Sequence, residues 1–272
     1  MSADTVGGPD AVPDESAELV RERRGPVAVL RLNRPEARNA LSPGLVSAIG
    51  AAVVEADDDP DVRAVVLTGT GTRAFCAGMD LRAFAQGDRA ASTDEHPGVA
   101  GFMRLVQGDI ATPIVGAANA TAVAGGFELL LACDLVVASS DATFGLPEVK
   151  RGLFAAGGGT LLGTRIPLPV ALEMVLTGDP IDAPRAYELG LVNAVVPPAD
   201  VLATAMRLAE RIAANGPLGV AASKELVRLS TSDRRRARER LAELQKTVFA
   251  SEDAKEGARA FIEKRPPVWK GR

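Results

Sequence analysis

The chain has 272 residues, a length that allows one large domain or two smaller ones. Hydrophobic residues make up 47% and charged residues 24% of the chain, which is ordinary usage for a globular protein and supplies a sizeable core. The net charge of −4 argues against nucleic acid as the main partner, because phosphate binding requires a broad basic surface.

The two cysteines, Cys76 and Cys133, are too few for a disulfide framework and fit a reducing compartment. No apolar run reaches the ~18–20 residues that span a membrane, so no membrane partner is expected. The first twenty residues contain several acids, no Lys or Arg and no long apolar centre, which argues against a secretory signal or an Arg-rich transit peptide. Residues 1–17 are therefore predicted to form a disordered acidic tail, and the protein is expected to be cytoplasmic.

Short aliphatic runs that end at polar or glycine turns predict strands at 26–33, 62–68, 113–118 and 134–138. Ser42-Pro43 supplies an N-cap and a first-turn proline, and apolar residues at helical spacing follow until the acidic run at 57–59. Further helices are predicted near 100–111 and from Gly125. Because strands and helices alternate, residues 18–197 are assigned to an α/β domain.

The pattern changes after Pro197-Pro198, where apolar residues at helical spacing predict only helices, at about 201–212, 218–229, 234–248 and 253–263. A helical region of about 70 residues buries little surface by itself. The C-terminal region, residues 198–272, is therefore expected to pack on the α/β part or on a partner subunit.

A run of small residues, 74–81 (AFCAGMDL), follows the predicted strand at 62–68. Small side chains let the backbone approach a ligand closely, and glycine permits conformations that aim N–H groups at one point. The alternative is a tight strand-to-helix turn without a binding role.

A second small-residue loop, 119–128, leads into a helix at Gly125-Gly126. A helix N-terminus that opens on glycines offers free N–H donors at the positive end of the helix dipole. Glu128 lies in the first turn, where it is a candidate catalytic acid or base and equally a capping residue.

A third candidate is Glu148, which follows Pro147 in a loop, with a Gly-Gly-Gly run at 157–159 beyond it. A solvated loop glutamate is the alternative.

Residues 69–74 match the dinucleotide fingerprint G-x-G-x-x-A, but Phe75–Gly78 interrupt the position where a long helix should begin. His96 is the only histidine, so neither a Ser-His-Asp triad nor a histidine-rich metal site is expected. The basic run 234–240 is interrupted by Glu239 and is interpreted as a solvated helix face.

Taken together, these segments resemble the enoyl-CoA hydratase/isomerase family, also known as the crotonase superfamily. The resemblance extends from Val27 to Arg272. The ordered set is specific, although each motif is weak alone; its segments are LNRPEARNAL at 32–41, FCAGMDL at 75–81, AGGFEL at 124–129, CD at 133–134, GLPE at 145–148, GGG at 157–159, AYELGLV at 186–192 and FIEKRPPVWKG at 261–271.

The resemblance implies a spiral of repeated ββα units with a C-terminal helical region that assembles a homotrimer or a dimer of trimers. It also implies an oxyanion hole made by the backbone amides of Met79 and Gly125. The family usually has a smaller residue at the position of Met79, and Phe127 is also larger than usual, which predicts an altered acyl pocket.

Hydratases of this family carry two glutamates, at the positions of Glu128 and Glu148, and both are present. The resemblance therefore implies reversible addition of water to a 2-enoyl-CoA, with Glu128 as the base and Glu148 as the proton donor. No cofactor is expected beyond the coenzyme A of the substrate, and no metal. Further substrate-binding or CoA-binding positions implied by the resemblance are Ala37, Arg38, Ala40, Ala77, Asp80, Leu81, Arg82 and Pro147, with Phe261 and Lys264 from a neighbouring subunit.

Three alternatives remain open at this point. One is another reaction on the same scaffold, such as isomerisation of a 3-enoyl-CoA or dehydration of a specialised 3-hydroxyacyl-CoA. The second is a non-catalytic acyl-CoA-binding protein, against which the presence of Glu128 and Glu148 argues. The third is a dinucleotide-dependent oxidoreductase, which rests only on residues 69–74.

Overall fold

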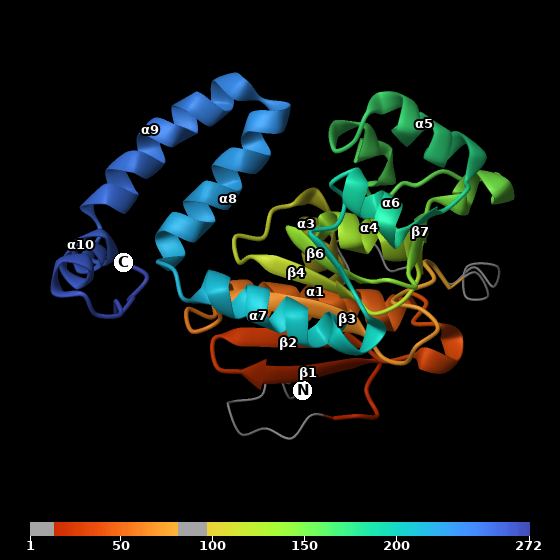
Figure 1. Cartoon of the computed structure of the whole chain (residues 1–272), viewed down its shortest axis with the longest axis horizontal. Helices are drawn as coiled ribbons and strands as arrows, with labels where there is room; N and C mark the ends of the chain where they lie inside the picture. Colours follow the sequence, from red (N-terminus) through yellow and green to blue (C-terminus); the bar gives the residue numbers. More distant parts are fainter. Residues whose placement is uncertain (1–13, 81–96) are drawn as a thin grey trace.

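The computed structural model describes residues 14–80 and 97–272, and Figure 1 shows their arrangement. Leu81, Arg82 and His96 lie outside the described residues. A six-stranded sheet forms the centre, in the order β1-β2-β3-β4-β6-β9. Its strands are β1 (Leu19–Arg24), β2 (Val27–Leu32), β3 (Ala64–Gly69), β4 (Ile114–Ala118), β6 (Leu135–Ser139) and β9 (Ala194–Val196).

The β1 and β2 strands are antiparallel, whereas all the other neighbours in this sheet are parallel. A smaller sheet has the order β5-β7-β8, with β5 (Ala122–Val123), β7 (Thr143–Gly145) and β8 (Ile181–Asp182). The predicted strands at 26–33, 62–68, 113–118 and 134–138 correspond to β2, β3, β4 and β6, so the predicted α/β class is confirmed.

The large sheet is buried on both faces. Side chains of a strand alternate between the faces, and in β2 the residues Ala28, Leu30 and Leu32 join one hydrophobic cluster while Val27 and Val29 join another. The first cluster includes α1 (Pro43–Asp58) and α4 (Gly125–Ala132), and the second includes α7 (Val201–Ala213). Continuous aliphatic runs suit strands that are covered on both sides.

The remaining elements surround this core. The helices are α3 (Pro97–Gln107), α5 (Leu168–Thr177), α6 (Ala183–Glu188), α8 (Pro217–Ser232), α9 (Arg234–Ala250) and α10 (Glu252–Glu263). Short 3₁₀ helices are η1 (Pro35–Ala37), η2 (Pro147–Arg151), η3 (Gly159–Thr164) and η4 (Pro198–Asp200). The four helices predicted after residue 197 correspond to α7, α8, α9 and α10.

The β1 strand was not predicted from the sequence. Its residues, LVRERR, include four charged side chains and no alternating apolar pattern. The strand lies at the edge of the sheet and is held by its antiparallel pairing with β2, so backbone hydrogen bonds rather than apolar periodicity fix it.

The C-terminal helices differ in how closely they pack on the sheet. Five residues of α7 are buried, whereas α8 and α9 bury none completely. The α8 helix is tied to the α/β part by Asp134, whose carboxylate lies 2.7 Å from Nζ of Lys224 and 2.8 Å from Nη2 of Arg228. In Figure 1, α9 and α10 lie at the left end, away from α4. Among the described helices, none has the length and apolar character required to cross a bilayer.

Candidate active site

Three chain segments that are far apart in sequence run side by side next to the end of β3. Leu41 donates its amide to the carbonyl oxygen of Gly78 at 2.8 Å, and Phe75 donates to the carbonyl oxygen of Thr121 at 2.9 Å. Leu41 and Cys76 each take part in a parallel bridge, to Met79 and Ala122 respectively. The segment from 75 to 80 therefore lies between 39–41 and 121–123.

The backbone amides of Met79 and Gly125 border the same small space. A Cβ atom added to Gly125 would lie 3.7 Å from the nitrogen of Met79, and one added to Gly78 would lie 3.1 Å from the nitrogen of Gly125. Gly78 has φ of +86°, a conformation that favours glycine. Within residues 14–80 and 97–272, neither amide donates to a protein acceptor. Two amide nitrogens from separate segments therefore lie close together, and neither N–H donates to an acceptor among the described residues.

The Gly125 amide belongs to the first turn of α4. Ala124 precedes it with φ 52° and ψ −134°, an uncommon conformation for alanine, and makes no side-chain cap. Gly126 has to be glycine, because a Cβ atom there would lie 2.2 Å from the carbonyl oxygen of Cys76. This close packing places the positive end of the α4 dipole beside Met79.

Glu128 lies one turn further along α4, and its carboxylate is almost completely buried at 7% residue exposure. Oε1 accepts a hydrogen bond from the amide of Gly159 at 2.9 Å, and the amide of Gly157 also donates to the carboxylate. The side chain therefore contacts the 157–159 turn rather than capping its own helix. Burial raises the pKa of Glu128 above its ordinary value, and the two amides oppose that rise.

Glu148 approaches from η2. Its Oε2 atom is buried and has no hydrogen-bond partner among the described residues. Burial raises the pKa of Glu148; its own backbone amide opposes this rise, and the charge of Glu128 adds to it. The charge of Glu128 thus influences Glu148, although the two residues come from different elements. Neighbouring carboxyl groups of raised pKa are suited to general acid and base chemistry.

The other predicted positions divide into three groups. The first group lies on two neighbouring segments, the 75–80 segment that contains Met79 and the 37–41 segment beside it, and comprises Ala37, Arg38, Ala40, Ala77 and Asp80. The two segments are joined where the amide of Ala77 donates to the carbonyl oxygen of Arg38 at 3.0 Å. Pro147 is the first residue of η2 and precedes Glu148. The third group is Phe261 on α10 and Lys264 just after it. In Figure 1 α10 lies at the left end of the molecule, far from α4, so the structure does not bring these residues to this site within one chain.

A shallow cavity of about 270 Å³ opens beside the same segments. Its lining includes Arg38 and Ala77, and it adds Arg73, which was not predicted. Nη2 of Arg73 donates to the carbonyl oxygen of Pro35 at 2.7 Å, so this cation is fixed beside Arg38. The only feature of the sequence that pointed to Arg73 is its position directly before the small-residue run that starts at Ala74.

Two interpretations of the sequence are corrected. Phe127 was expected to alter the acyl pocket, but it is only 2% exposed and packs against Phe144, with ring centroids 5.6 Å apart. It therefore fills the core. The G-x-G-x-x-A match at 69–74 does not open a helix, because residues 70–80 form turns and isolated bridges. The dinucleotide interpretation thus loses the strand-to-helix context that it requires.

Asn39 is a further residue of the site that sequence analysis did not single out. It is completely buried and has φ of 53°. Its side chain accepts from the amide of Arg34 at 2.9 Å and donates to the carbonyl oxygens of Thr70 and Ala74, each at 3.0 Å. Asn39 therefore joins the 34–41 turn to the end of β3 and to the start of the 74–80 segment. Among the described residues, no cluster of His, Cys, Asp and Glu is arranged to hold a metal ion.

Comparison with known proteins gives a consistent result. The sequence model of the enoyl-CoA hydratase/isomerase family matches residues 22–272. A carnitinyl-CoA dehydratase from Salmonella typhi is 40% identical over 265 residues, which cover 94% of this chain and all of the relative. The crystal structure of an enoyl-CoA hydratase from Mycobacterium tuberculosis H37Rv superposes with a TM-score of 0.87 at 42% identity, covering 94% of this chain and 100% of that one. A carnitinyl-CoA hydratase from Mycobacterium avium has a TM-score of 0.72 at 45% identity, covering 94% and 99%.

Proposed function

The chain belongs to the enoyl-CoA hydratase/isomerase family and has its crotonase fold, and from this premise we propose that it is an enoyl-CoA hydratase. The reaction is the reversible addition of water to a 2-enoyl-CoA, which gives a 3-hydroxyacyl-CoA. One observation carries the choice of reaction: Glu128 and Glu148 form an electrostatically interacting pair of carboxyl groups, both with raised pKa. The Met79 and Gly125 amides belong to the same group of segments.

In this proposal the thioester oxygen accepts hydrogen bonds from the amides of Met79 and Gly125. Attack at Cβ moves an electron pair from the carbon–carbon double bond toward that oxygen, which becomes the oxyanion of an enolate. Donors that are already in place stabilise this charge without reorganisation, and removing one such donor typically costs about 3 kcal/mol of transition-state stabilisation. The dipole of α4 acts in the same direction, because the oxyanion lies at its N-terminus.

The two carboxyl groups complete the reaction. Glu128, as carboxylate, removes a proton from water while the hydroxyl group bonds to Cβ. Glu148, as carboxylic acid, then delivers its proton to Cα of the enolate. The raised pKa of Glu148 supports its role as the acid, because burial and the nearby Glu128 charge both favour the protonated form. The amides that donate to Glu128 support its role as the base, because they favour the charged form.

Coenzyme A is part of the substrate, and the proposal requires no other cofactor. Arg38 and Arg73, beside the cavity, supply positive charge for its phosphates. Phe261 and Lys264 would have to come from a neighbouring subunit of a homotrimer or a dimer of trimers. The 85% exposure of Phe261 and the absence of completely buried residues in α8 and α9 support assembly through the C-terminal helices. Two buried free thiols, Cys76 and Cys133, are compatible with the cytoplasmic location that forms part of the proposal.

A second candidate is dehydration of a specialised 3-hydroxyacyl-CoA, which uses the same groups in the reverse direction. It is favoured by the names of the Salmonella and Mycobacterium avium relatives, a carnitinyl-CoA dehydratase and a carnitinyl-CoA hydratase. Product analysis with 2-enoyl-CoA, 3-enoyl-CoA and 3-hydroxyacyl-CoA substrates separates hydration, isomerisation and specialised dehydration.

The test is hydration of crotonyl-CoA by the Glu128→Gln and Glu148→Gln variants. Each variant is expected to lose at least about a hundredfold in kcat, the scale of general acid–base catalysis, while its Kd for butyryl-CoA stays within about threefold of the wild type. Unchanged turnover in either variant contradicts the assignment of that glutamate. A wild-type protein that binds acyl-CoA tightly but turns over no ester across short, long and branched chains would instead be a non-catalytic binder.

A further inference from the structure

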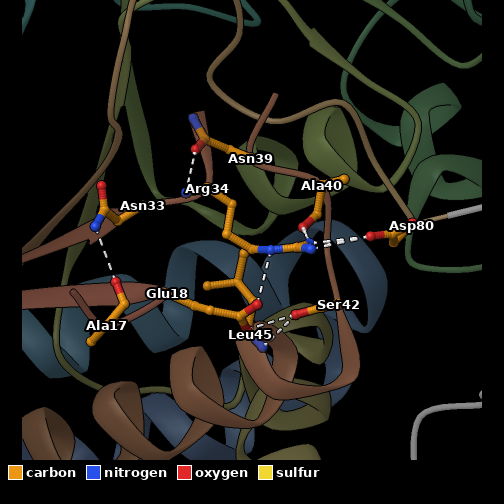
Figure 2. A network of polar contacts seen from close by, with 9 residues as sticks. All are labelled: Ala17, Glu18, Asn33, Arg34, Asn39, Ala40, Ser42, Leu45 and Asp80. Atoms are coloured by element: carbon orange, nitrogen blue, oxygen red, sulfur yellow. Dashed lines mark hydrogen bonds and ion pairs between the residues drawn. The ribbon is translucent and has the colours of Figure 1, made fainter. Parts of the chain in front are cut away.

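The guanidinium group of Arg34 joins three separate segments beside the candidate oxyanion hole. Figure 2 shows its contacts: Nε lies 2.9 Å from Oε1 of Glu18, and Nη1 donates to the carbonyl oxygen of Ala40 at 2.6 Å. Nη1 and Nη2 both lie 3.3 Å from Oδ2 of Asp80. The side chain of Arg34 is 18% exposed and that of Asp80 is 19% exposed, so the ion pair is largely shielded from water.

These contacts lie next to the amide that the proposed reaction uses. Asp80 follows Met79 directly, and Ala40 precedes Leu41, which is bridged to Met79. The backbone already joins the two segments, since Leu41 donates to Gly78 and accepts from the amide of Asp80 at 3.1 Å. Arg34 adds a second connection at the side-chain level, because one planar group binds Ala40 and Asp80 together.

The other side of Arg34 is anchored to a helix. Glu18, its ion-pair partner, accepts from Oγ of Ser42 at 2.7 Å through Oε2. Ser42 is the N-cap of α1 and accepts from the amide of Leu45 at 3.0 Å. Through Glu18 and Ser42, the guanidinium group is therefore held in place relative to the N-terminal end of α1, a long helix that packs in the core.

Charge gives the contact a second consequence. The Asp80 carboxylate is one residue from the Met79 amide, and its negative charge opposes the growth of negative charge on the thioester oxygen. A shielded charge pair interacts more strongly than one in bulk water, so pairing with Arg34 offsets this repulsion. A guanidinium suits the role because its rigid planar fork points five N–H groups in fixed directions, whereas an ammonium group is a compact charge on a flexible stem.

We propose that Arg34 is a positioning residue for the oxyanion hole: it fixes the Met79 amide by joining Ala40 to Asp80, and it pairs the Asp80 charge. The proposal rests on the hydratase function argued above. Arg34 touches no substrate atom in this scheme. Its effect is expected in carbonyl polarisation and kcat rather than in affinity for the CoA ester.

The experiment compares Arg34→Met with Arg23→Met. Arg23 is a matched control, because its side chain is 15% exposed and pairs with Asp59, which caps the C-terminal end of α1, whereas the Arg34 cluster reaches Ser42 at the N-terminal end. The first readout is the infrared carbonyl stretch of bound butyryl-CoA labelled with ¹³C at the thioester carbon, a saturated ester that cannot be hydrated. The second is kcat and KM for crotonyl-CoA.

Arg34→Met is expected to lose most of the shift in carbonyl frequency that binding causes, and to lower kcat by about ten- to a hundredfold, the scale of a misplaced catalytic group. KM should stay within about threefold, and Arg23→Met should match the wild type in both readouts. Arg34→Lys keeps the charge but not the fork and should give an intermediate shift. Arg34→Met/Asp80→Asn, which also removes the negative charge of Asp80, should be several times more active than Arg34→Met.

The proposal is overturned if the carbonyl frequency of the ligand shifts as much in Arg34→Met as in the wild type. It is also overturned if Arg23→Met loses as much of this shift as Arg34→Met does. A double variant no more active than Arg34→Met overturns pairing with Asp80 as the route. If circular dichroism shows that Arg34→Met does not fold, the carbonyl shift is measured in Arg34→Lys instead. A carbonyl shift in Arg34→Lys equal to that of the wild type then overturns the proposal. A wild-type protein that polarises the carbonyl without hydrating crotonyl-CoA defeats the hydratase function only, because the carbonyl measurement still tests Arg34.

Discussion

The amide of Gly159 donates to Oε1 of Glu128 at 2.9 Å, although the two residues are 31 positions apart in the chain. The second carboxylate oxygen is enclosed by the same turn, since a Cβ atom added to Gly157 would lie 2.7 Å from Oε2. The turn thus holds the carboxylate by backbone alone and has no space for a side chain. The carboxylate of the proposed base can therefore take this orientation only because Gly157 has no side chain.

Gly157→Ala is expected to lower kcat for crotonyl-CoA by about tenfold or more, with a loss of about 1–3 kcal/mol in the free energy of unfolding, the usual cost of an overpacked site. The added methyl group meets the end of the Glu128 side chain, which can move aside, so the variant should still fold. The same movement takes the carboxylate out of its position, and small misplacements of a catalytic group are costly in rate. Steady-state kinetics and urea unfolding measure the two effects.

Gly219→Ala provides the matched control for that substitution. Gly219 lies in α8, and a Cβ atom there meets nothing within 4 Å. Alanine in a helix interior is favoured over glycine by about 0.5–1 kcal/mol, so this variant should be slightly more stable and fully active. Equal activity of Gly157→Ala and Gly219→Ala would mean that the position of Glu128 does not limit turnover.

The raised pKa of Glu148 predicts how stability depends on pH. A carboxyl group whose pKa is higher in the folded state holds its proton more tightly there, so its favourable contribution is complete below the unfolded pKa, about 4.5. That contribution is lost as the pH rises through the folded pKa. Glu148→Gln removes the charge and should therefore raise the thermal midpoint at pH 8, with a smaller increase as the pH falls toward 4.5. The test is calorimetry of both proteins across this range, and an increase that grows toward low pH contradicts the sign.

The central sheet could be predicted from the sequence because its parallel strands are buried on both faces, which leaves uninterrupted aliphatic runs such as β3. The α4 helix could be predicted because Gly125-Gly126 marks its start. β1 could not, because an edge strand with four charged residues has no apolar periodicity. Phe127 was assigned to the pocket because it adjoins Glu128, but successive residues of a helix point about 100° apart. One of the two therefore faces the core while the other faces the 157–159 turn.

The connections that fix the site could not be predicted for a different reason. Arg34 contacts Glu18, 16 positions earlier, and Asp80, 46 positions later. Glu128 contacts Gly159 across 31 positions. No local period relates such residues, because the fold alone brings them together. Individual residue types, such as a run of glycines, indicate that the backbone is approached closely, but they do not identify what approaches it.

Arg38→Ala is expected to weaken binding of butyryl-CoA by about tenfold, an effect of about 1.4 kcal/mol, and to leave binding of butyryl-pantetheine unchanged. The physical reason is that pantetheine lacks the nucleotide phosphates that Arg38 and Arg73 are proposed to contact beside the cavity. Salt should reduce the difference between the two ligands, because exposed charges are screened. Isothermal titration measures the Kd of each ligand. Arg185→Ala on α6 is the control, since Arg185 is an exposed arginine that pairs with Glu188 and does not line the cavity. An equal loss for both ligands would indicate a role at the pantetheine or acyl end.

Met79→Ala separates the backbone role of this residue from its side-chain role. The proposed hydrogen bond comes from the amide, which alanine retains, so kcat for crotonyl-CoA should stay within about threefold of the wild type. The Met79 side chain is 45% exposed beside the space that its amide borders. Removing it should therefore enlarge the acyl pocket and raise kcat/KM for longer or branched 2-enoyl-CoA esters relative to crotonyl-CoA. One methylene in an apolar pocket typically changes discrimination by about tenfold or more, so a series of chain lengths resolves the effect. An unchanged preference, with full activity, would show that the Met79 side chain lies outside the acyl pocket, whereas loss of activity on every ester would show that the amide position depends on that side chain.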